Sequence, residues 1–377
     1  MSKLKELVDQ KDLRIFVYAT GAGAGIQSAI WHTLGCSSFF VGAEFPYAPS
    51  ESSRALGYTP TSFVSEEMAI DLAMAAYVRA YEFGKKSVGI GLTASVASSR
   101  AHRGDHRIIV SGCSDDGVLT AYMTLPKGVG DEARALDGKI ADSLAIKILL
   151  HAAGQNYVLP KETHCDVPVM VADTNSQAFF SLEARPYFTS SGQRKSFTVE
   201  DRQNSVFYPG NFDPLHEGHI GAAEATLDYI ANKIGKRKKV IFTTTTNPPH
   251  KSPLSSPEVL QRVALMKGHN FLVTKGDARY LDKARLFPNS SFILGADALI
   301  RMLDPKWGVP TQDLLDELTN LKTTYYVLGR LVEGKFITLH DIEDQYPILY
   351  KYQHLFEPVS GRWDVSSTEK RAALNQV

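Results

Sequence analysis

Two histidines three residues apart stand where a strand-like run gives way to a helical one. His216 and His219 belong to the segment Tyr-Pro-Gly-Asn-Phe-Asp-Pro-Leu-His-Glu-Gly-His at 208–219. The apolar run 206–208 before it is typical of a buried strand, and 220–234 has helical spacing with few breakers. Backbone N–H groups at a helix N-terminus attract anions, and a histidine beside them adds a donor or a positive charge. The segment is therefore suited to phosphate chemistry.

Two segments downstream add groups that nucleotides need. Lys251 ends the run Asn-Pro-Pro-His-Lys and can place a mobile positive charge on phosphate oxygens. A predicted strand then ends in Gly-x-Asp, where Gly295 allows close approach of a nucleoside and Asp297 can accept from ribose hydroxyls or an amine. Each segment also has an ordinary structural interpretation, a surface proline turn for the first and a helix N-cap for the second.

Aromatic and hydroxyl side chains nearer the C-terminus complete the set. Trp307 can stack on a base or a pyridinium ring, although a tryptophan in such a position is more often a core residue. The run Val-Ser-Ser-Thr-Glu-Lys-Arg places a capping serine, Ser366 or Ser367, before a short helix starting near Thr368. With Arg371 this cap forms a compact polyphosphate site, and without a ligand it is an ordinary capped helix.

The bulk composition excludes several classes of protein. The 377 residues include 41 basic and 41 acidic side chains, so nothing indicates a nucleic-acid or membrane-surface partner. No run is long and apolar enough for a signal peptide or a membrane span, and we expect a cytoplasmic protein. Cys36, Cys113 and Cys165 are far apart and indicate no metal site and no disulfide framework.

The order of predicted elements indicates an α/β fold in two domains. Residues 14–154 alternate strand-like and helical runs, with a glycine-rich turn at 21–25 and a helix at 65–83 capped by Ser65. The alternation after residue 204 predicts a doubly wound parallel sheet, in which ligands bind at the carboxyl ends of the strands. The predicted strands are 14–18, 87–93, 106–111, 206–208, 239–243, 270–274, 291–294 and 324–328, and the other predicted helices are 26–34, 133–153 and 220–234. We therefore expect an α/β domain at 1–157, a connector with some local structure at 158–203, and a second α/β domain at 204–377.

The motifs of the second half, taken in order, resemble those of nicotinate/nicotinamide mononucleotide adenylyltransferases of the His-x-Gly-His nucleotidyltransferase superfamily. That family has Gly-x-Phe-Asp-Pro-x-His-x-Gly-His, then Pro-Pro-His-Lys, then Gly-x-Asp with a downstream Trp, and finally Ser-Ser-Thr-x-x-Arg. The resemblance covers about residues 205–375 and implies a Rossmann-like fold. It implies ATP with Mg²⁺ and a mononucleotide as substrates. The segment between Thr274 and Phe292 departs from the usual bacterial pattern, which leaves the choice of mononucleotide open.

Roles carried over from this family fall on matching positions. The phosphate of the mononucleotide would attack the α-phosphorus of ATP in line, and the protein would position and stabilise charge. The resemblance assigns the transferring phosphoryl group to His216 and His219. The backbone of Gly210, Asn211 and Phe212 would cradle phosphate. The β- and γ-phosphates would be held by Lys251, Ser367, Thr368 and Arg371, with Ser366 as the other capping serine. Gly295 and Asp297 would contact the nucleoside, and Trp307 could stack on the pyridine ring.

Residues 15–154 resemble the C-terminal domain of CinA proteins, which often deamidate nicotinamide mononucleotide. The matching stretches are Tyr-Ala-Thr-Gly-Ala-Gly-Ala-Gly at 18–25, Gly-Ala-Glu-Phe-Pro-Tyr at 42–47 and Phe-Val-Ser-Glu-Glu-Met-Ala at 63–69. Tyr47 keeps the family's tyrosine. The position of its presumed catalytic serine falls on Gly21, and that of its lysine falls on Ser52. Because such a hydrolase needs an activated hydroxyl and a basic partner, we expect no deamidase activity.

Three alternatives stay open at this point. The first half could retain deamidase activity, the second half could use CTP with another phosphorylated small molecule, or both halves could sense nucleotides without catalysis. CinA-like domains generally self-associate, so the resemblance also implies a homodimer formed through the first domain.

Overall fold

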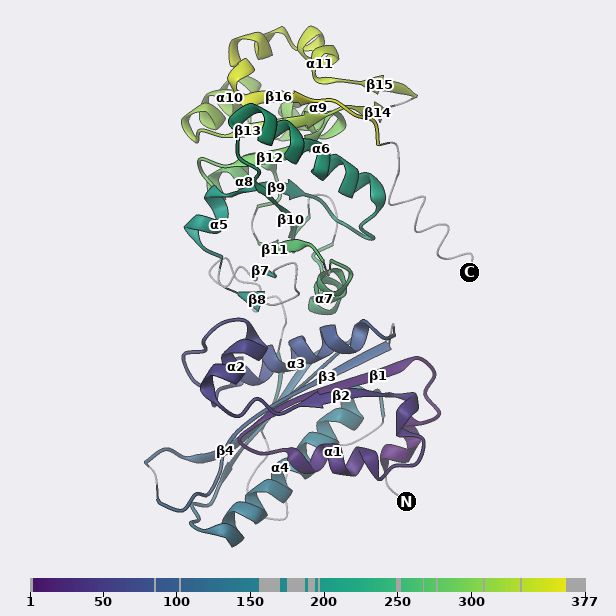
Figure 1. The fold of residues 1–377 in the computed structure, drawn as a ribbon, viewed down its shortest axis with the longest axis vertical. Helices are drawn as coiled ribbons and strands as arrows, with labels where there is room; N and C mark the ends of the chain where they lie inside the picture. Colours follow the sequence, from purple (N-terminus) through teal and green to yellow (C-terminus); the bar gives the residue numbers. More distant parts are fainter. Residues whose placement is uncertain are drawn as a thin grey trace. The chain divides into compact units, whose positions relative to one another are not determined.

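The computed structural model of the protein resolves into two compact units (Figure 1). The N-terminal unit comprises Met1–Phe179, Gln193–Lys195 and Ser255–Ala264, and the C-terminal unit comprises Phe180–Gly192, Ser196–Leu254 and Leu265–Val377. The residues that the structure describes are 3–84, 86–101, 103–155, 170–174, 187–188, 194–195, 197–248, 252–266, 268–275, 277–307, 309–332 and 334–363. The domain limits expected from the sequence stay predictions, because most of 156–196 lies outside these ranges.

A mixed sheet forms the centre of the N-terminal unit. In the described part of the chain it has six strands in the order β2-β1-β3-β4-β5-β6. Strands β2, β1 and β3 are parallel, and the remaining neighbours are antiparallel. The bounds are β1 Leu13–Thr20, β2 Phe40–Glu44, β3 Lys86–Ser95, β4 His106–Ser114, β5 Gly117–Leu125 and β6 Met170–Thr174. β6 comes from the stretch expected to be a connector, so part of that stretch completes this sheet.

Helices cover both faces of the sheet, with α1 and α4 on one side and α2 and α3 on the other (Figure 1). Alternate residues of a strand point to opposite faces. In β1, Ile15 and Val17 accordingly pack in the cluster with α1 and α4, whereas Phe16 and Tyr18 pack against α2 and α3. The bounds are η1 Lys3–Leu7, α1 Ala24–Trp31, η2 Cys36–Ser38, α2 Pro49–Leu56, α3 Glu66–Tyr81 and α4 Asp131–Ala152.

The sheet of the C-terminal unit has the strand order of a doubly wound fold. Among the described residues its order is β16-β13-β12-β9-β10-β11-β7-β8, and the six strands from β16 to β11 run parallel. The bounds are β7 Tyr187–Phe188, β8 Arg194–Lys195, β9 Ser205–Pro209, β10 Lys239–Thr245, β11 Asn270–Thr274, β12 Ser291–Gly295, β13 Thr324–Leu328 and β16 Phe356–Val359. A separate hairpin pairs β14 Arg330–Val332 with β15 Lys335–Ile337.

This order contains a reversal point beside β9. The chain moves from β9 outward through β10 and β11, then returns to β12 on the other side of β9 and continues to β13 and β16. Strands β9 and β12 share one registered pair, Phe207 with Phe292. Ligands of open α/β sheets bind outside the carboxyl ends of the strands at such a reversal, because the two neighbouring connections leave there on opposite faces.

Two helical layers cover the parallel sheet. Helix α6 contacts β10 and β16, and an apolar cluster on the sheet joins Phe207, Phe292 and Tyr325 to side chains of α8, α9, α10 and α11. The bounds are α5 Val199–Gln203, α6 Glu217–Ile234, α7 Ser256–Leu265, α8 Tyr280–Leu286, α9 Ala296–Leu303, η4 Pro305–Trp307, α10 Thr311–Asn320, α11 Leu339–Gln345 and η5 Pro347–Leu355.

Most elements expected from the sequence are confirmed. The strands predicted at 270–274 and 324–328 match β11 and β13, and Ser65 caps α3 by accepting from the N–H of Met68. The helix predicted at 26–34 is wrong at its end, because α1 stops at Trp31. Leu34 is 87% exposed, so the apolar run that suggested a helix there is not buried at its end.

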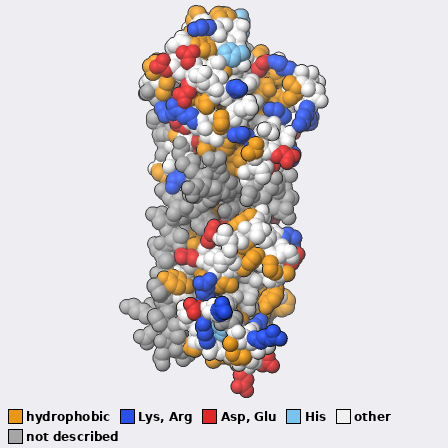
Figure 2. Space-filling view, turned by 90° about the vertical axis from the view of Figure 1, so that its left-hand side faces the viewer, with side chains coloured by type: hydrophobic (Ala, Val, Ile, Leu, Met, Phe, Trp, Pro, Cys, Tyr) orange, Lys and Arg blue, Asp and Glu red, His pale blue; other side chains and the backbone are white. Residues whose placement is uncertain are grey.

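The surface carries both signs of charge. Figure 2 shows basic and acidic side chains interspersed on the face that it draws of each unit, in keeping with the equal numbers in the sequence. Across the described ranges, none of the helices combines the length and the apolar character needed to cross a bilayer.

Candidate functional site

The loop that leaves β9 is held tightly against the neighbouring strand. The backbone N–H of Gly210 donates to the carbonyl of Thr243, the next strand's residue, at 2.9 Å. Phe212 has a φ of 46° and turns its ring back under the loop, where it is buried. A Cβ on Gly210 would lie 2.6 Å from that ring, so only glycine fits. The predicted phosphate-binding loop thus sits at the carboxyl end of β9, beside the reversal point.

The two histidines stack at the start of α6. His216 is the N-cap residue, and the ring centroids of His216 and His219 lie 3.7 Å apart with 23° between the planes. The Nδ1 atom of His219 accepts from the backbone N–H of His216 at 3.4 Å. A neutral imidazole that accepts at Nδ1 carries its proton on Nε2, so His219 presents a donor from that atom. The prediction that the motif occupies a strand-to-helix turn is confirmed.

An aromatic shell surrounds the inner histidine. The rings of Phe212 and Tyr208 meet His219 edge-on, with centroids 5.1 and 6.0 Å away, and Phe242 packs against Phe212. Burial in this shell, with smaller effects of His216 and Arg330, lowers the pKa of His219 to about 3. The sequence left open whether this histidine supplies a donor or a charge, and its surroundings favour the neutral donor.

The end of β12 faces the same region. Gly295 is followed by Asp297 in the first turn of α9, whose carboxylate pairs with Arg301 Nη2 at 2.7 Å and lies 3.9 Å from Arg330 Nε. A Cβ on Gly295 would lie 2.6 Å from Asp297 Oδ1 and 3.3 Å from Arg330 Cγ. The glycine therefore lets these two charged side chains cross the end of the strand.

Arg330 and Trp363 are two residues of this region that sequence reasoning missed. Arg330 lowers the pKa of His219 and donates from Nη1 to the carbonyl of Trp363 at 2.7 Å. The indole of Trp363 rests on Gly221 of α6, where a Cβ would lie 2.5 Å from Nε1. A basic residue directly after a predicted parallel strand could have drawn attention to Arg330, whereas nothing local marks Trp363.

A pocket of about 460 Å³ opens next to the phosphate-binding loop. Its floor is formed by the ends of β9 and β10, with Gly210, Asn211 and the threonines 243–245. Residues of α8, α9 and α10 form the walls. The structure therefore places two of the predicted cofactor-binding residues, Gly210 and Asn211, on the floor of a nucleotide-sized cavity.

Several predicted site residues cannot be placed. Lys251, Ser366, Ser367, Thr368, Arg371 and the side chain of Trp307 lie outside the described residues. Trp363 is the last described residue before the serine-rich segment, and it lies beside α6. Within the described ranges, no group of three or more His, Cys, Asp or Glu side chains is arranged to hold a metal ion.

The glycine-rich turn of the N-terminal unit is closed by the chain itself. Gly21 has a φ of 81°, and a Cβ there would lie 2.1 Å from the carbonyl oxygen of Ala94. At the start of α1, Asp142 Oδ1 accepts from the backbone N–H of Gly25 at 3.0 Å. A carboxylate from α4 thus occupies the position at which the N–H groups of this turn could have held a phosphate.

Ser52 and Tyr47 stand at the other two positions that were compared with the deamidases. Ser52 is buried, and its hydroxyl donates to the carbonyl of Pro46 at 2.8 Å. Tyr47 is 70% exposed, with its hydroxyl 3.5 Å from Arg134 Nη2. Ser52 is therefore a hydrogen-bonded interior residue and supplies no base.

The second half of the chain matches a known family. Residues 207–373 match the model of the family described as Cytidylyltransferase-like. The C-terminal unit carries a Cytidylyltransferase-like domain. The match begins at β9 and extends through the segment that follows Trp363, so it spans both the histidine motif and the Ser-Ser-Thr motif.

Curated relatives of the Cytidylyltransferase-like domain share one printed name. A probable nicotinate-nucleotide adenylyltransferase of Desulfitobacterium hafniense (strain Y51) is 31% identical over 134 residues, 36% of this chain and 54% of the relative. One from Thermus thermophilus is 30% identical over 116 residues, 27% of this chain and 60% of the relative. A further one from D. hafniense (strain DCB-2) is 27% identical over 190 residues, 44% of this chain and 82% of the relative. The chain thus spans little more than half the length of the first two.

Solved structures similar to this chain include CinA proteins. A competence-damaged protein (CinA) superfamily protein from Escherichia coli is 20% identical, with a TM-score of 0.32, 39% of this chain and 83% of that chain covered. A competence/damage-inducible protein from Agrobacterium tumefaciens is 18% identical, with a TM-score of 0.31, 41% of this chain and 98% of that chain covered.

Proposed function

We propose that the C-terminal unit transfers an adenylyl group from ATP to the phosphate of a pyridine mononucleotide and releases pyrophosphate. The observation that carries the proposal is the stacked pair His216 and His219 beside the Gly210 loop, at the sheet reversal, next to a nucleotide-sized pocket. The names of the curated relatives point to the same reaction.

In this reaction a phosphate oxygen of the mononucleotide forms a bond to the α-phosphorus of ATP, and the bond from that phosphorus to the bridging oxygen of the β-phosphate breaks. His219 donates from Nε2 to a non-bridging oxygen of the transferring group, where negative charge develops. The N–H groups of the 210–212 loop and of the first turn of α6 bind phosphate oxygens. Arg330, fixed between Asp297 and the Trp363 carbonyl, adds positive charge to the same region.

The remaining groups keep the roles that the resemblance gave them. In the proposal Lys251, Ser366, Ser367, Thr368 and Arg371 hold the β- and γ-phosphates, and Gly295 and Asp297 contact the nucleoside. Bound with ATP, Mg²⁺ would neutralise part of the negative charge of the polyphosphate. The pocket between Gly210 and α8 then receives the acceptor, whose ring Trp307 is proposed to approach.

Pyrophosphate release with Mg²⁺ tests the proposal. ATP or CTP would be offered with nicotinic acid mononucleotide, nicotinamide mononucleotide or neither, since the family description leaves CTP as a competing donor. We expect release with ATP and a pyridine mononucleotide, lost by about 100-fold or more in His219→Ala. His340→Ala, which alters a histidine whose side chain is 77% exposed, is the matched control and retains activity. Pyrophosphate release with CTP but not with ATP contradicts the proposal, and so does the absence of release with every pair of substrates.

The N-terminal unit has a separate part in the proposal. We propose that it lacks deamidase activity and that it forms a homodimer, in which the exposed side chains of Trp31 and Leu34 find apolar cover. A cytoplasmic location belongs to the same proposal, because that is where ATP-dependent nucleotide synthesis has its substrates. Light scattering of the full chain measures the dimer, and a monomer at micromolar concentration contradicts it.

A further inference from the structure

A second cavity, of about 470 Å³, opens on the N-terminal unit where β4 and β5 meet the start of α3. Two cross-strand pairs form its floor: Arg107 with Thr124, and Ile109 with Tyr122. Residues opposite each other in an antiparallel ladder project from one face, as do residues two positions along. The segment 64–66 belongs to its wall, and none of the glycine-rich residues 21–25 is among the described residues that line it.

Several polar groups of this lining have no partner within the described part of the chain. They belong to the side chains of Glu66, Arg107, Tyr122 and Thr124. Arg107 donates from Nη2 to the carbonyl of Val64, and this is its one side-chain hydrogen bond in the described ranges. By contrast, the hydroxyls of Ser62 and Ser65 are already used, the first by the Val64 carbonyl at 3.2 Å and the second by the N–H of Met68.

The cavity contains one positive and one negative side chain that do not pair with each other. The hydrogen bond to Val64 holds the Arg107 guanidinium beside the wall, and Glu66 is two residues further along the chain. On α2 the exposed side chains of Glu51 and Arg54 do form an ion pair, at 2.7 Å. The charges of Arg107 and Glu66 are therefore both available to a ligand in the cavity that they line.

These two charges fit a ligand that itself has one charge of each sign. The planar fork of Arg107 binds a carboxylate through two parallel hydrogen bonds, and the carboxylate of Glu66 accepts from an ammonium group. A ligand with a negative charge alone would be repelled by Glu66, and a ligand with a positive charge alone would be repelled by Arg107. The lining thus favours a zwitterion over either simple ion.

The remaining groups of the floor fit a polar, uncharged substituent. The hydroxyls of Tyr122 and Thr124 can each donate and accept a hydrogen bond. An amide needs both an acceptor for its N–H groups and a donor for its oxygen, and the two hydroxyls supply them. Ile109, which is buried, offers an apolar surface between them for the aliphatic part of the ligand.

We infer that this cavity binds a free α-amino acid, with its carboxylate on Arg107, its ammonium on Glu66 and a polar, uncharged side chain over Tyr122 and Thr124. The inference goes beyond the proposed transfer reaction and does not depend on it. It gives the N-terminal unit a ligand site apart from the glycine-rich turn that Asp142 closes.

Isothermal titration calorimetry of the full chain tests the inference with L-glutamine as the probe. Two analogues serve as comparisons: glutaramate lacks the ammonium group, and 4-aminobutyramide lacks the carboxylate. We expect L-glutamine to bind with a Kd of about 1 mM or tighter. Each analogue should bind about tenfold or more weakly, because it leaves one charge of the cavity without a partner.

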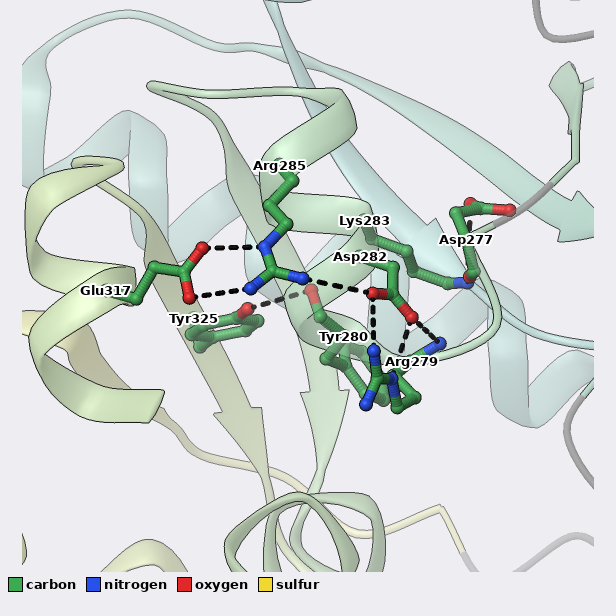
Figure 3. Close-up of polar contacts among 8 residues, drawn as sticks. All are labelled: Asp277, Arg279, Tyr280, Asp282, Lys283, Arg285, Glu317 and Tyr325. Carbon is green, nitrogen blue, oxygen red and sulfur yellow. Dashed lines mark hydrogen bonds and ion pairs between the residues drawn. The ribbon is translucent and has the colours of Figure 1, made fainter. Parts of the chain in front are cut away.

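Charge-removing variants locate the site. Glu66→Gln and Arg107→Met should each weaken the binding of L-glutamine by about tenfold or more. Glu67→Gln is the matched control for the first, since Glu67 is the next exposed carboxylate of α3 and does not line the cavity. Arg285→Met is the control for the second, because Figure 3 shows that guanidinium paired with Glu317 in the C-terminal unit. Both controls should retain the original Kd.

Both altered side chains are exposed, and an unchanged thermal midpoint without the probe verifies that the variants fold. Glu66→Gln decides the test by itself if the loss of the hydrogen bond from Arg107 to Val64 lowers that midpoint. Three results overturn the inference: no binding of L-glutamine at 10-fold above the expected Kd, equal binding of L-glutamine and either analogue, or the same Kd in Glu66→Gln and Glu67→Gln. None of them bears on pyrophosphate release by the C-terminal unit.

Discussion

The imidazole rings of His216 and His219 stack face to face with their centroids 3.7 Å apart. Two positive charges at this separation would repel strongly, and the aromatic shell around His219 already disfavours its charged form. The pair therefore works with His219 neutral, as a hydrogen-bond donor fixed at the N-terminus of α6.

The first prediction concerns pH. The pKa of His219 is about 3 in the folded protein and about 6.5 when unfolded, so the unfolded state binds the proton more tightly. The free energy of unfolding is therefore unaffected by His219 protonation above pH 6.5. It falls as the pH drops from 6.5 toward 3, by at most about 1.4 kcal/mol per pH unit. His219→Gln should reduce the slope between pH 6.5 and 4.5. Urea unfolding measures it, in a Trp31→Phe background where fluorescence reports only Trp307 and Trp363 of the C-terminal unit. Parallel slopes for the two proteins would contradict this account.

The second prediction separates activity from stability at Gly221. Alanine has a higher helix propensity than glycine by about 1 kcal/mol, so Gly221→Ala in α6 should not lower the unfolding free energy. Its Cβ would lie 2.5 Å from Trp363 Nε1 and displace the residue that precedes the serine-rich segment. We expect the KM for ATP to rise by about tenfold or more.

The control for this variant is Gly138→Ala in α4, where a Cβ meets nothing within 4 Å. It should leave the KM for ATP unchanged. An active Gly221→Ala protein with an ordinary KM would show that the position of Trp363 has no bearing on ATP binding.

The third prediction concerns the lost serine of the N-terminal unit. Gly21→Ser should not create a deamidase, since its Cβ would collide with the Ala94 carbonyl and its backbone would stay in the left-handed region. Such strain costs about 1–3 kcal/mol or more. Ammonia release from nicotinamide mononucleotide and the thermal midpoint are the two measurements. Ammonia production by a stable Gly21→Ser protein would refute the prediction.

The fourth prediction concerns the carboxylate that closes the glycine-rich turn. Asp142→Ala leaves the Gly25 N–H without its acceptor and should cost about 1–3 kcal/mol of stability. Inorganic phosphate should then raise the thermal midpoint of Asp142→Ala more than that of the unaltered protein, because the anion takes the vacated position. Asp142→Asn retains an acceptor oxygen and should lie between the two. If phosphate shifted the thermal midpoint equally in all three proteins, the closure of the glycine-rich turn by Asp142 would be contradicted.

Local order was predictable where neighbouring residues determine it. The cap of α3 by Ser65 depends on a side chain and an N–H three residues away, and β11 and β13 are short apolar runs bounded by polar residues. Strand β5 was missed although its apolar side chains partly alternate. Strand β2 is half-buried throughout and gave little contrast to detect.

The sequence by itself determined the α/β class, the histidine motif at a strand-to-helix turn and the glycine-rich turn, because each depends on spacing within about a dozen residues. Only the tertiary structure decided the strand order, the electrostatic influence of Arg330 on His219, the packing of Trp363 on Gly221 and the closure of the Gly25 turn by Asp142. These three relationships join residues more than a hundred positions apart in the sequence.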